Sequence, residues 1–363
     1  MLERYSRLIL IGFTTAAMAL SIVAPAQAEL PRTASGHPDL SGTYNIATLT
    51  PLQRPEQFGD KATITTEEAN RIAEYWANNL AKDSEKSDPD RQAPPAGGVE
   101  IYVPEFSGAA GGVGGYNAFY VDIGESNFQL DGQIRTSIIT QPSNGKLPKL
   151  SAQGMAKAKA DRANYHENTG TAWWIDRPQG PYDNPENRPL AERCLLGFGS
   201  TAGPPALPVM YNNLKRIVQT PDSIMIVNEM NHDARVIRLN APHQPSTQRS
   251  WLGDSVGHWE GDTLVIDTVH FREEPALFMA SEDLHVIERF SRIDEDTLRY
   301  EFTVNDPNWS EPWGGEYPWP ASDEKVYEYA CHEGNYALGG ILRGARLLES
   351  EAMANAATDE AAE

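Results

Sequence analysis

Cysteine is scarce in this sequence, and so are basic side chains and long apolar runs. There are two cysteines, and 30 Lys and Arg stand against 51 Asp and Glu, which gives a formal net charge of −21. A chain this acidic is repelled by nucleic acid and by anionic membrane surfaces, so we expect neither as a partner. After residue 28 no apolar run is long enough to cross a bilayer, and we expect no stable membrane insertion.

Several catalytic motifs are missing as well. The chain has no Gly-x-Ser-x-Gly of a serine hydrolase, and its Gly/Ala-rich run 107–115 lacks the spacing of a phosphate-binding loop. It also has no His-x-His or His-Glu-x-x-His spacing, so we predict no metal site and no cofactor.

The first 28 residues match an export signal. Arg4 and Arg7 form a basic start, residues 8–23 are mostly apolar, and Ala26-Gln27-Ala28 fits the small-x-small cleavage pattern. We therefore expect a cleavable signal peptide over 1–28 and a periplasmic or secreted protein.

Short strand patterns separated by turns dominate the rest of the chain. Residues 297–304 alternate most cleanly, and Thr65 and Glu68 have the spacing of a helix-capping box. We expect a mainly β fold over 29–348, an antiparallel barrel or sandwich that forms a single domain with helical and loop insertions. Further expected elements are strands over 133–139 and 325–331, helices over 151–168 and 338–348, an aromatic loop over 305–320 and a disordered acidic tail over 349–363.

The stretch 217–271 reads as three strands, with a polar run between the apolar ones. If a strand continues through that run, Glu229, Asn231, Asp233 and Arg235 share one face, while His232 lies on the other. That polar face is either a solvated outer surface or a patch inside a barrel, and the sequence leaves both open.

The polar run supplies the candidate catalytic residues Glu229, His232, Asp233 and Arg235. His232 or Asp233 would act as the base, and Arg235 or Arg135 would stabilise developing negative charge. In the alternative interpretation, His232 is a turn or core histidine and Asp233 and Arg235 form a structural ion pair. The candidate substrate-binding residues are Arg135, Tyr116, Asn117, Trp259, His332 and Glu333, of which Trp259 could instead be a core anchor.

These residues predict an exported enzyme that does metal-independent acid/base chemistry on a small lipophilic or aromatic molecule, as a lyase, hydratase or isomerase. The alternative is a non-catalytic periplasmic carrier that binds a hydrophobic ligand. A third class, an exported structural or interaction module, also stays open.

The two cysteines, Cys194 and Cys331, would form a disulfide in an oxidising compartment. The competing interpretation makes Cys331-His332-Glu333 a metal-binding fragment.

Several segments together resemble a large family of exported bacterial proteins with lipocalin-like β-barrel character. These segments are 38–42, 135–139, 144–148, 193–195, 217–221, 232–235, 251–255, 257–265 and 331–336. They span nearly the whole chain after the export signal. The resemblance implies a lipocalin-like barrel and export, and it implies no particular reaction.

Overall fold

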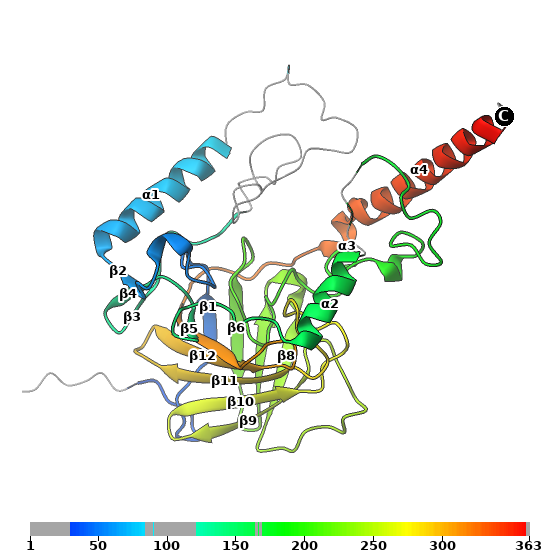
Figure 1. Ribbon diagram of the computed structural model, residues 1–363. Coiled ribbons are helices and arrows are strands. Elements are labelled where there is room, and N and C mark those ends of the chain that lie inside the picture. Colours follow the sequence, from blue (N-terminus) through cyan, green and yellow to red (C-terminus); the bar gives the residue numbers. More distant parts are fainter. Residues whose placement is uncertain (1–29, 84–89, 91–120, 164–165, 167–168, 361–363) are drawn as a thin grey trace, which may run out of the picture.

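The computed structural model describes residues 30–83, 90, 121–163, 166 and 169–360 (Figure 1). The expected signal peptide and the candidate residues Tyr116 and Asn117 lie outside the described residues. Within them, one sheet has ten strands and a second has three. The strands of the large sheet are β1 (Gly42–Asn45), β5 (Ile139–Gln141), β6 (Leu214–Gln219), β7 (Ser223–Asn228), β8 (Ala234–Leu239), β9 (Asp254–Glu260), β10 (Thr263–Val269), β11 (His285–Arg292), β12 (Thr297–Asn305) and β13 (Trp313–Pro320).

The small sheet and the helices surround one end of the large sheet (Figure 1). The small sheet has the order β2-β4-β3 and consists of β2 (Thr63–Ile64), β3 (Gln129–Leu130) and β4 (Gln133–Arg135). The α-helices are α1 (Thr66–Asp83), α2 (Ala152–Ala163), α3 (Cys331–Gly334) and α4 (Tyr336–Glu360). None of the helices in the described ranges is long and apolar enough to cross a membrane.

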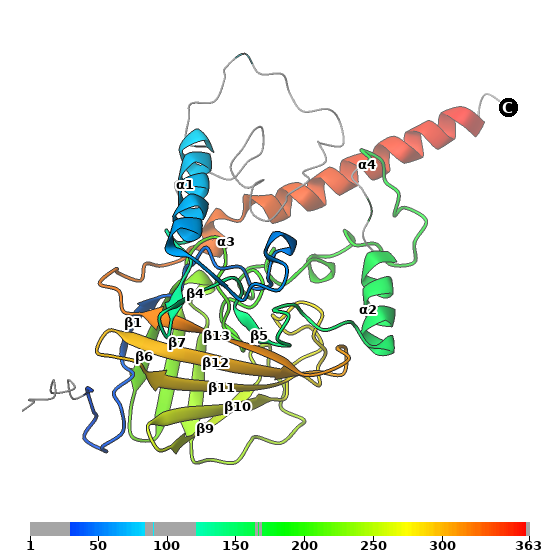
Figure 2. The same cartoon turned by 60° about the vertical axis from the view of Figure 1, so that its left-hand side comes forward.

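The large sheet curls into a half-barrel with the strand order β1-β6-β7-β8-β9-β10-β11-β12-β13-β5 (Figure 2). A bridge between Tyr44 of β1 and Ala321, just past β13, joins two strands that are far apart in this order. Among the described strands, β8 and β9 form the one parallel pair, so the chain must cross back over the sheet between them through residues 240–253. The mainly β prediction is confirmed, while the lipocalin-like character stays a prediction.

The concave side of the sheet holds the core. Its largest fully buried side chains include Trp313, Trp319, Tyr300, Tyr317 and Phe290. Their rings pack on each other, with centroids 4.8 Å apart for Phe290 and Tyr300 and 5.0 Å apart for Tyr300 and Trp319. These side chains form the aromatic centre of the core.

The aromatic segment 305–320, which we expected to be a loop, contains strand β13. Trp313, Tyr317 and Trp319 are buried on it, and Gly315 lets β5 approach, because a Cβ there would lie 2.3 Å from the Ile138 carbonyl oxygen. Proline and glycine obscure the alternation of buried and exposed residues in the sequence of β13. The expected strand over 325–331 is wrong, because residues 322–330 are irregular and α3 begins at Cys331.

The strand expected over 133–139 is also wrong, because it divides into β4 and β5, which belong to different sheets. The capping box is confirmed, since the Glu68 carboxylate accepts from the Thr65 N–H at 2.9 Å and the Thr65 hydroxyl accepts from the Glu68 N–H at 3.2 Å. The helix expected over 151–168 is confirmed in part, because α2 ends at Ala163.

The C-terminal part is tied to the middle of the chain. Cys194 and Cys331 form the expected disulfide, which spans 137 residues. The closing helix is longer than expected, because α4 continues past residue 348 to Glu360. Trp174 donates a hydrogen bond of 2.6 Å to Glu349 and packs beside Ala345, so this part of the helix has packing of its own.

Candidate functional site

The turn between β7 and β8 holds three of the four predicted catalytic residues, Glu229, His232 and Asp233, and Arg235 follows on β8. Strand β7 ends at Asn228, and a 3-10 helix over Met230–His232 follows. Asn231 and His232 have φ values of 59° and 48°, in the left-handed region that a strand cannot contain. The continuous strand that would place Glu229, Asn231, Asp233 and Arg235 on one face is therefore wrong. His232 is exposed, Asp233 is half-buried and Glu229 is buried.

Lys215 lies beneath this turn and was not predicted from the sequence as a site residue. It is opposite Asn228 in the β6–β7 pair, is 1 % exposed and donates a hydrogen bond to the Asn228 side-chain oxygen. Burial lowers the pKa of Lys215 to about 7, although Glu229 and Asp233 oppose the shift. The sequence feature that could have identified Lys215 is its spacing. It lies two residues before the apolar Ile217, so both side chains point to the buried face of β6.

The two carboxylates of the turn are shifted as well. Burial raises the pKa of Asp233 to about 6, against a hydrogen bond from the Gly197 N–H and the charges of His232 and Lys215. Burial also raises the pKa of Glu229. Shifts of this kind are common at functional sites, but they also occur in buried structural clusters.

Arg235 does not take part in this cluster. Its side chain is 3 % exposed and forms an ion pair with Glu288, whose side chain is 0 % exposed. The second bond of this bidentate pair measures 2.8 Å, and Tyr300 donates to the same carboxylate at 2.7 Å. Arg235 is thus a structural ion-pair residue, but its partner is Glu288 and not Asp233. A guanidinium committed in this way within the core is not placed to stabilise a substrate.

The predicted substrate-binding residues lie on separate elements. Arg135 on β4 donates to Glu316 at 3.3 Å, and Trp259 on β9 is half-buried against the core and stacks on His37 at 4.6 Å. His332 and Glu333 are exposed on α3. These three places are well apart in Figure 1, and in Figure 2 β9 lies at the opposite end of the sheet from α3, so the structure does not assemble them into one site.

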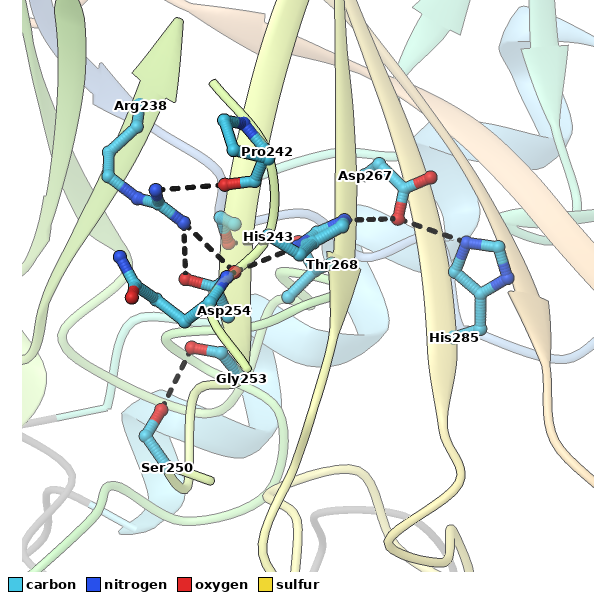
Figure 3. A network of polar contacts seen from close by, with 11 residues as sticks. Arg238, Pro242, His243, Ser250, Gly253, Asp254, Asp267, Thr268 and His285 are labelled. Carbon is cyan, nitrogen blue, oxygen red and sulfur yellow. Dashed lines mark hydrogen bonds and ion pairs between the residues drawn. The ribbon is translucent and has the colours of Figure 1, made fainter. Parts of the chain in front are cut away.

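A different group of titratable side chains (Figure 3) comes from β8 to β11 and the crossover 240–253, and its strand residues alternate with buried ones, so it lies on the side of the sheet opposite the core. His243 Nδ1 is 2.8 Å from Asp254 Oδ2, and its Nε2 is 3.3 Å from Asp267 Oδ1. His285 Nε2 is 3.1 Å from the same Asp267 oxygen. We call Arg238, His243, Asp254, Asp267 and His285 the histidine–aspartate network.

The topology of the sheet brings these residues together. Asp254, Asp267 and His285 lie on the neighbouring strands β9, β10 and β11, and each alternates with buried residues that face the core. His243 comes from the crossover 240–253 that joins the parallel strands β8 and β9, and its ring lies beside Asp254 and Asp267 on this side of the sheet. Each residue is one polar position in an otherwise ordinary strand or loop, so no local motif marked the network.

Asp254 anchors one end of the network. It accepts two hydrogen bonds from Arg238, at 2.8 and 3.0 Å, and one from the Gln244 N–H at 2.9 Å. Burial alone would raise the pKa of Asp254, but the bonds from Gln244, His243 and Arg238 outweigh burial and lower it. Asp254 is therefore a fixed negative charge that holds the imidazole of His243 in place.

His270 adds a third imidazole to this region. Its ring centroid is 5.8 Å from that of His243, and its backbone has a φ of 60°. Its Nδ1 is buried and has no hydrogen-bond partner in the described part of the chain. Such strain and an unsatisfied polar atom are more frequent at functional sites than elsewhere.

The accessible end of the network is the pair Asp267 and His285, whose side chains are both 38 % exposed. When Nε2–H of His285 donates to Asp267, the tautomer is fixed and Nδ1 becomes the basic nitrogen. None of the described residues forms a hydrogen bond with Nδ1, and Figure 3 shows the far side of the ring turned away from Asp267. This arrangement can accept a proton from a substrate and return it.

Among the described residues, no group of three or more His, Cys, Asp or Glu side chains is arranged to hold a metal ion. Comparison of the chain with protein-family models, with curated proteins and with solved structures found no match.

Proposed function

We propose that this protein is an enzyme that moves protons on a small molecule, with His285 as the acid/base and Asp267 as the residue that orients it. The observation that carries the proposal is the single Asp267 oxygen within bonding distance of both His285, at 3.1 Å, and His243, at 3.3 Å, on an accessible face. The reaction classes that fit are those expected from the sequence, namely lyase, hydratase or isomerase.

The residues of the network have distinct roles in this chemistry. In a lyase, His285 Nδ1 takes a proton from a substrate carbon, the C–H electron pair forms a new double bond, the bond from the next carbon to the leaving group breaks, and the proton goes to that leaving group. In an isomerase, the C–H electron pair forms the new double bond while the electrons of an existing double bond move to the atom that takes the proton back. In a hydratase, His285 takes a proton from water as the water oxygen bonds to one carbon of a double bond, and the electrons of that double bond take up the proton at the other carbon. His243 lies between two carboxylates, and with Arg238 it keeps Asp267 oriented toward His285. His243 is thus a positioning residue.

The turn cluster of Asp233, Glu229 and Lys215 is a second candidate centre for the same chemistry. It is favoured by the pKa values of about 6 for Asp233 and about 7 for Lys215. The burial of Lys215 counts against it, because a substrate would reach the ammonium group only after the turn opened. The alternative function as a carrier is less favoured, because large aromatic side chains pack together on the concave side of the sheet.

Export forms part of the proposal. The disulfide between Cys194 and Cys331 is compatible with an oxidising compartment. Cleavage after residue 28, a periplasmic or secreted location and the lipocalin-like relationship complete the proposal, and the sequence patterns described above support them.

Turnover of an unfractionated mixture of small metabolites, followed by mass spectrometry, tests this function. We expect the purified protein to deplete one compound and to form its isomer, dehydrated product or hydrate. H285N should reduce that rate about a hundredfold or more, as loss of a general acid/base does. H37N is the matched control, because His37 stacks on Trp259 outside the network.

The same assay separates the two candidate centres. A loss of turnover in D233N that H285N does not share would transfer the reaction to the turn between β7 and β8. Melting temperatures of all the variants must be measured alongside, so that unfolding is not mistaken for lost chemistry.

A further inference from the structure

A hollow of about 240 Å³ lies over β11, β12 and β13, next to β5. Its lining includes Gln141, Ile287, Arg289, Glu301, Thr303 and Glu316. It lies on the convex side of the sheet, outside the packed core. None of these residues is among the site residues predicted from the sequence.

The hollow begins beside the histidine–aspartate network. His285 and Ile287 are two residues apart on β11, so their side chains point to the same side of the sheet and are about 7 Å apart along the strand. Asp267 lies on β10 directly opposite Ile287, which lines the hollow, and the hollow extends over β12 and β13 on the other side of β11. The pair of His285 and Asp267 therefore lies at the edge of the hollow, one same-face position along β11 from Ile287.

Three charged residues cross the hollow in register. Arg289 is opposite Glu301 in the β11–β12 pair, and Glu301 is opposite Glu316 in the β12–β13 pair. Directly opposite residues in a sheet have Cβ atoms about 5 Å apart, so this row presents a donor and two acceptors at close spacing. Thr303 adds a hydroxyl group and Gln141 an amide.

Glu316, one of the two acidic groups of the row, is not free to bind a cation. Glu316 already has Arg135 at 3.3 Å and Arg299 at 3.7 Å. Burial raises the pKa of Glu316, and these two arginines oppose the shift. A cationic ligand would have to approach a carboxylate whose charge is largely balanced, whereas a neutral hydroxyl group only needs an acceptor oxygen.

The lining suits a ligand that both donates and accepts hydrogen bonds. A hydroxyl group does both, and the C–H face of a ring can pack on Ile287, which also lines the hollow. We propose that this hollow is the substrate pocket of the His285 centre and that it binds a small, uncharged, polyhydroxylated molecule such as a monosaccharide or a cyclic polyol. The assignment to substrate rests on the proposed function, and it replaces the lipophilic or aromatic substrate expected from the sequence.

Saturation-transfer NMR on the purified protein tests the site directly. The probes are glucose, galactose and myo-inositol, with putrescine as a cationic comparator and 1-naphthol as an aromatic one. T303W would fill the hollow from an exposed position on the outer side of β12. V218W is the matched control, an exposed residue on the outer side of β6 that is not part of the lining.

We expect at least one sugar or polyol to bind to the unmodified protein and to H285N. T303W should weaken that binding about tenfold or more, which corresponds to roughly 1.4 kcal/mol, and V218W should leave it unchanged. Binding that persists in T303W, preference for putrescine or 1-naphthol, or no binding of any sugar or polyol would overturn the proposal. Binding at the hollow without turnover of any compound would support the site and count against the proposed function.

Discussion

His285 and Asp267 meet across β11 and β10, with His285 Nε2 3.1 Å from Asp267 Oδ1. Both side chains point away from the core and are partly exposed, so the pair combines a fixed imidazole with access for a small molecule. The four residues predicted from the polar run do not provide this combination, because Arg235 is committed to Glu288 in the core and His232 is an exposed turn residue.

The first prediction concerns the tautomer of His285. At alkaline pH, where imidazole is neutral, we expect His285 to carry its proton on Nε2, because Asp267 accepts a hydrogen bond there. Long-range ¹H–¹⁵N NMR measures this directly. D267A should shift His285 toward a mixture of tautomers and leave His37 unchanged. An Nδ1–H tautomer in the unmodified protein would show that the Asp267 contact is not a hydrogen bond in solution.

The second prediction concerns the buried pair Arg235 and Glu288. E288A leaves a buried guanidinium unpaired and should lower the free energy of unfolding by about 3–5 kcal/mol. The double variant R235M/E288L removes both charges and should recover most of that loss. Urea unfolding of both variants measures the difference. If the double variant is no more stable than E288A, the cost does not come from an unpaired buried charge.

The third prediction uses the lowered pKa of Lys215. Its folded-state value of about 7 lies below the unfolded value of 10.5. Between these two pH values the unfolded chain binds more protons, so this lysine makes the protein more stable as pH rises, by at most about 1.4 kcal/mol per pH unit. Unfolding measured at pH 7, 8 and 9 should show this increase, and K215M should lack it. An increase of the same size in K215M would assign the effect to other groups.

The fourth prediction uses the raised pKa of Asp233, which changes stability with pH in the opposite direction from Lys215. Its folded-state value of about 6 lies above the unfolded value of 3.8, so the folded chain binds more protons between these pH values. Its contribution is therefore complete at low pH and is lost as pH rises through this window. In pairwise comparison, the stability of D233N relative to the unmodified protein should rise from pH 4 to pH 6. A stability difference between the two proteins that stays constant from pH 4 to pH 6 would contradict the raised pKa of Asp233.

The disulfide gives the fifth prediction. Cys194 and Cys331 close a loop of 137 residues, and the chain-entropy model assigns such a loop about 5 kcal/mol. C194S/C331S should therefore melt well below the unmodified protein, and treatment with a reductant should bring the unmodified protein to the same temperature. Equal melting temperatures with and without the disulfide would contradict this.

Patterns within one segment predicted the parts of the fold that depend on that segment alone. The alternation in β12 and the capping box of Thr65 and Glu68 are local, and the structure contains both. Strand β13 was missed because tryptophan, proline and glycine obscure its alternation, although Trp313 and Trp319 are buried on it.

The candidate site could not be found in this way because its contacts are long-range. His243 is 24 residues from Asp267, and His285 is 18 residues from it. Which strands become neighbours, and the fact that β8 and β9 run parallel, decide these contacts. A single Asp or His at an alternating position looks like an ordinary solvent-facing residue until its neighbouring strand is known.

Transfer of deuterium from solvent to carbon tests the central claim most directly. The protein is incubated in D₂O with the compound that it turns over, and mass spectrometry follows deuterium at the carbon-bound positions of that compound. We predict incorporation that falls about a hundredfold or more in H285N, falls in D267N and persists in H37N. Incorporation at an unchanged rate in H285N, in a protein that melts normally, would contradict the assignment of His285 as the acid/base.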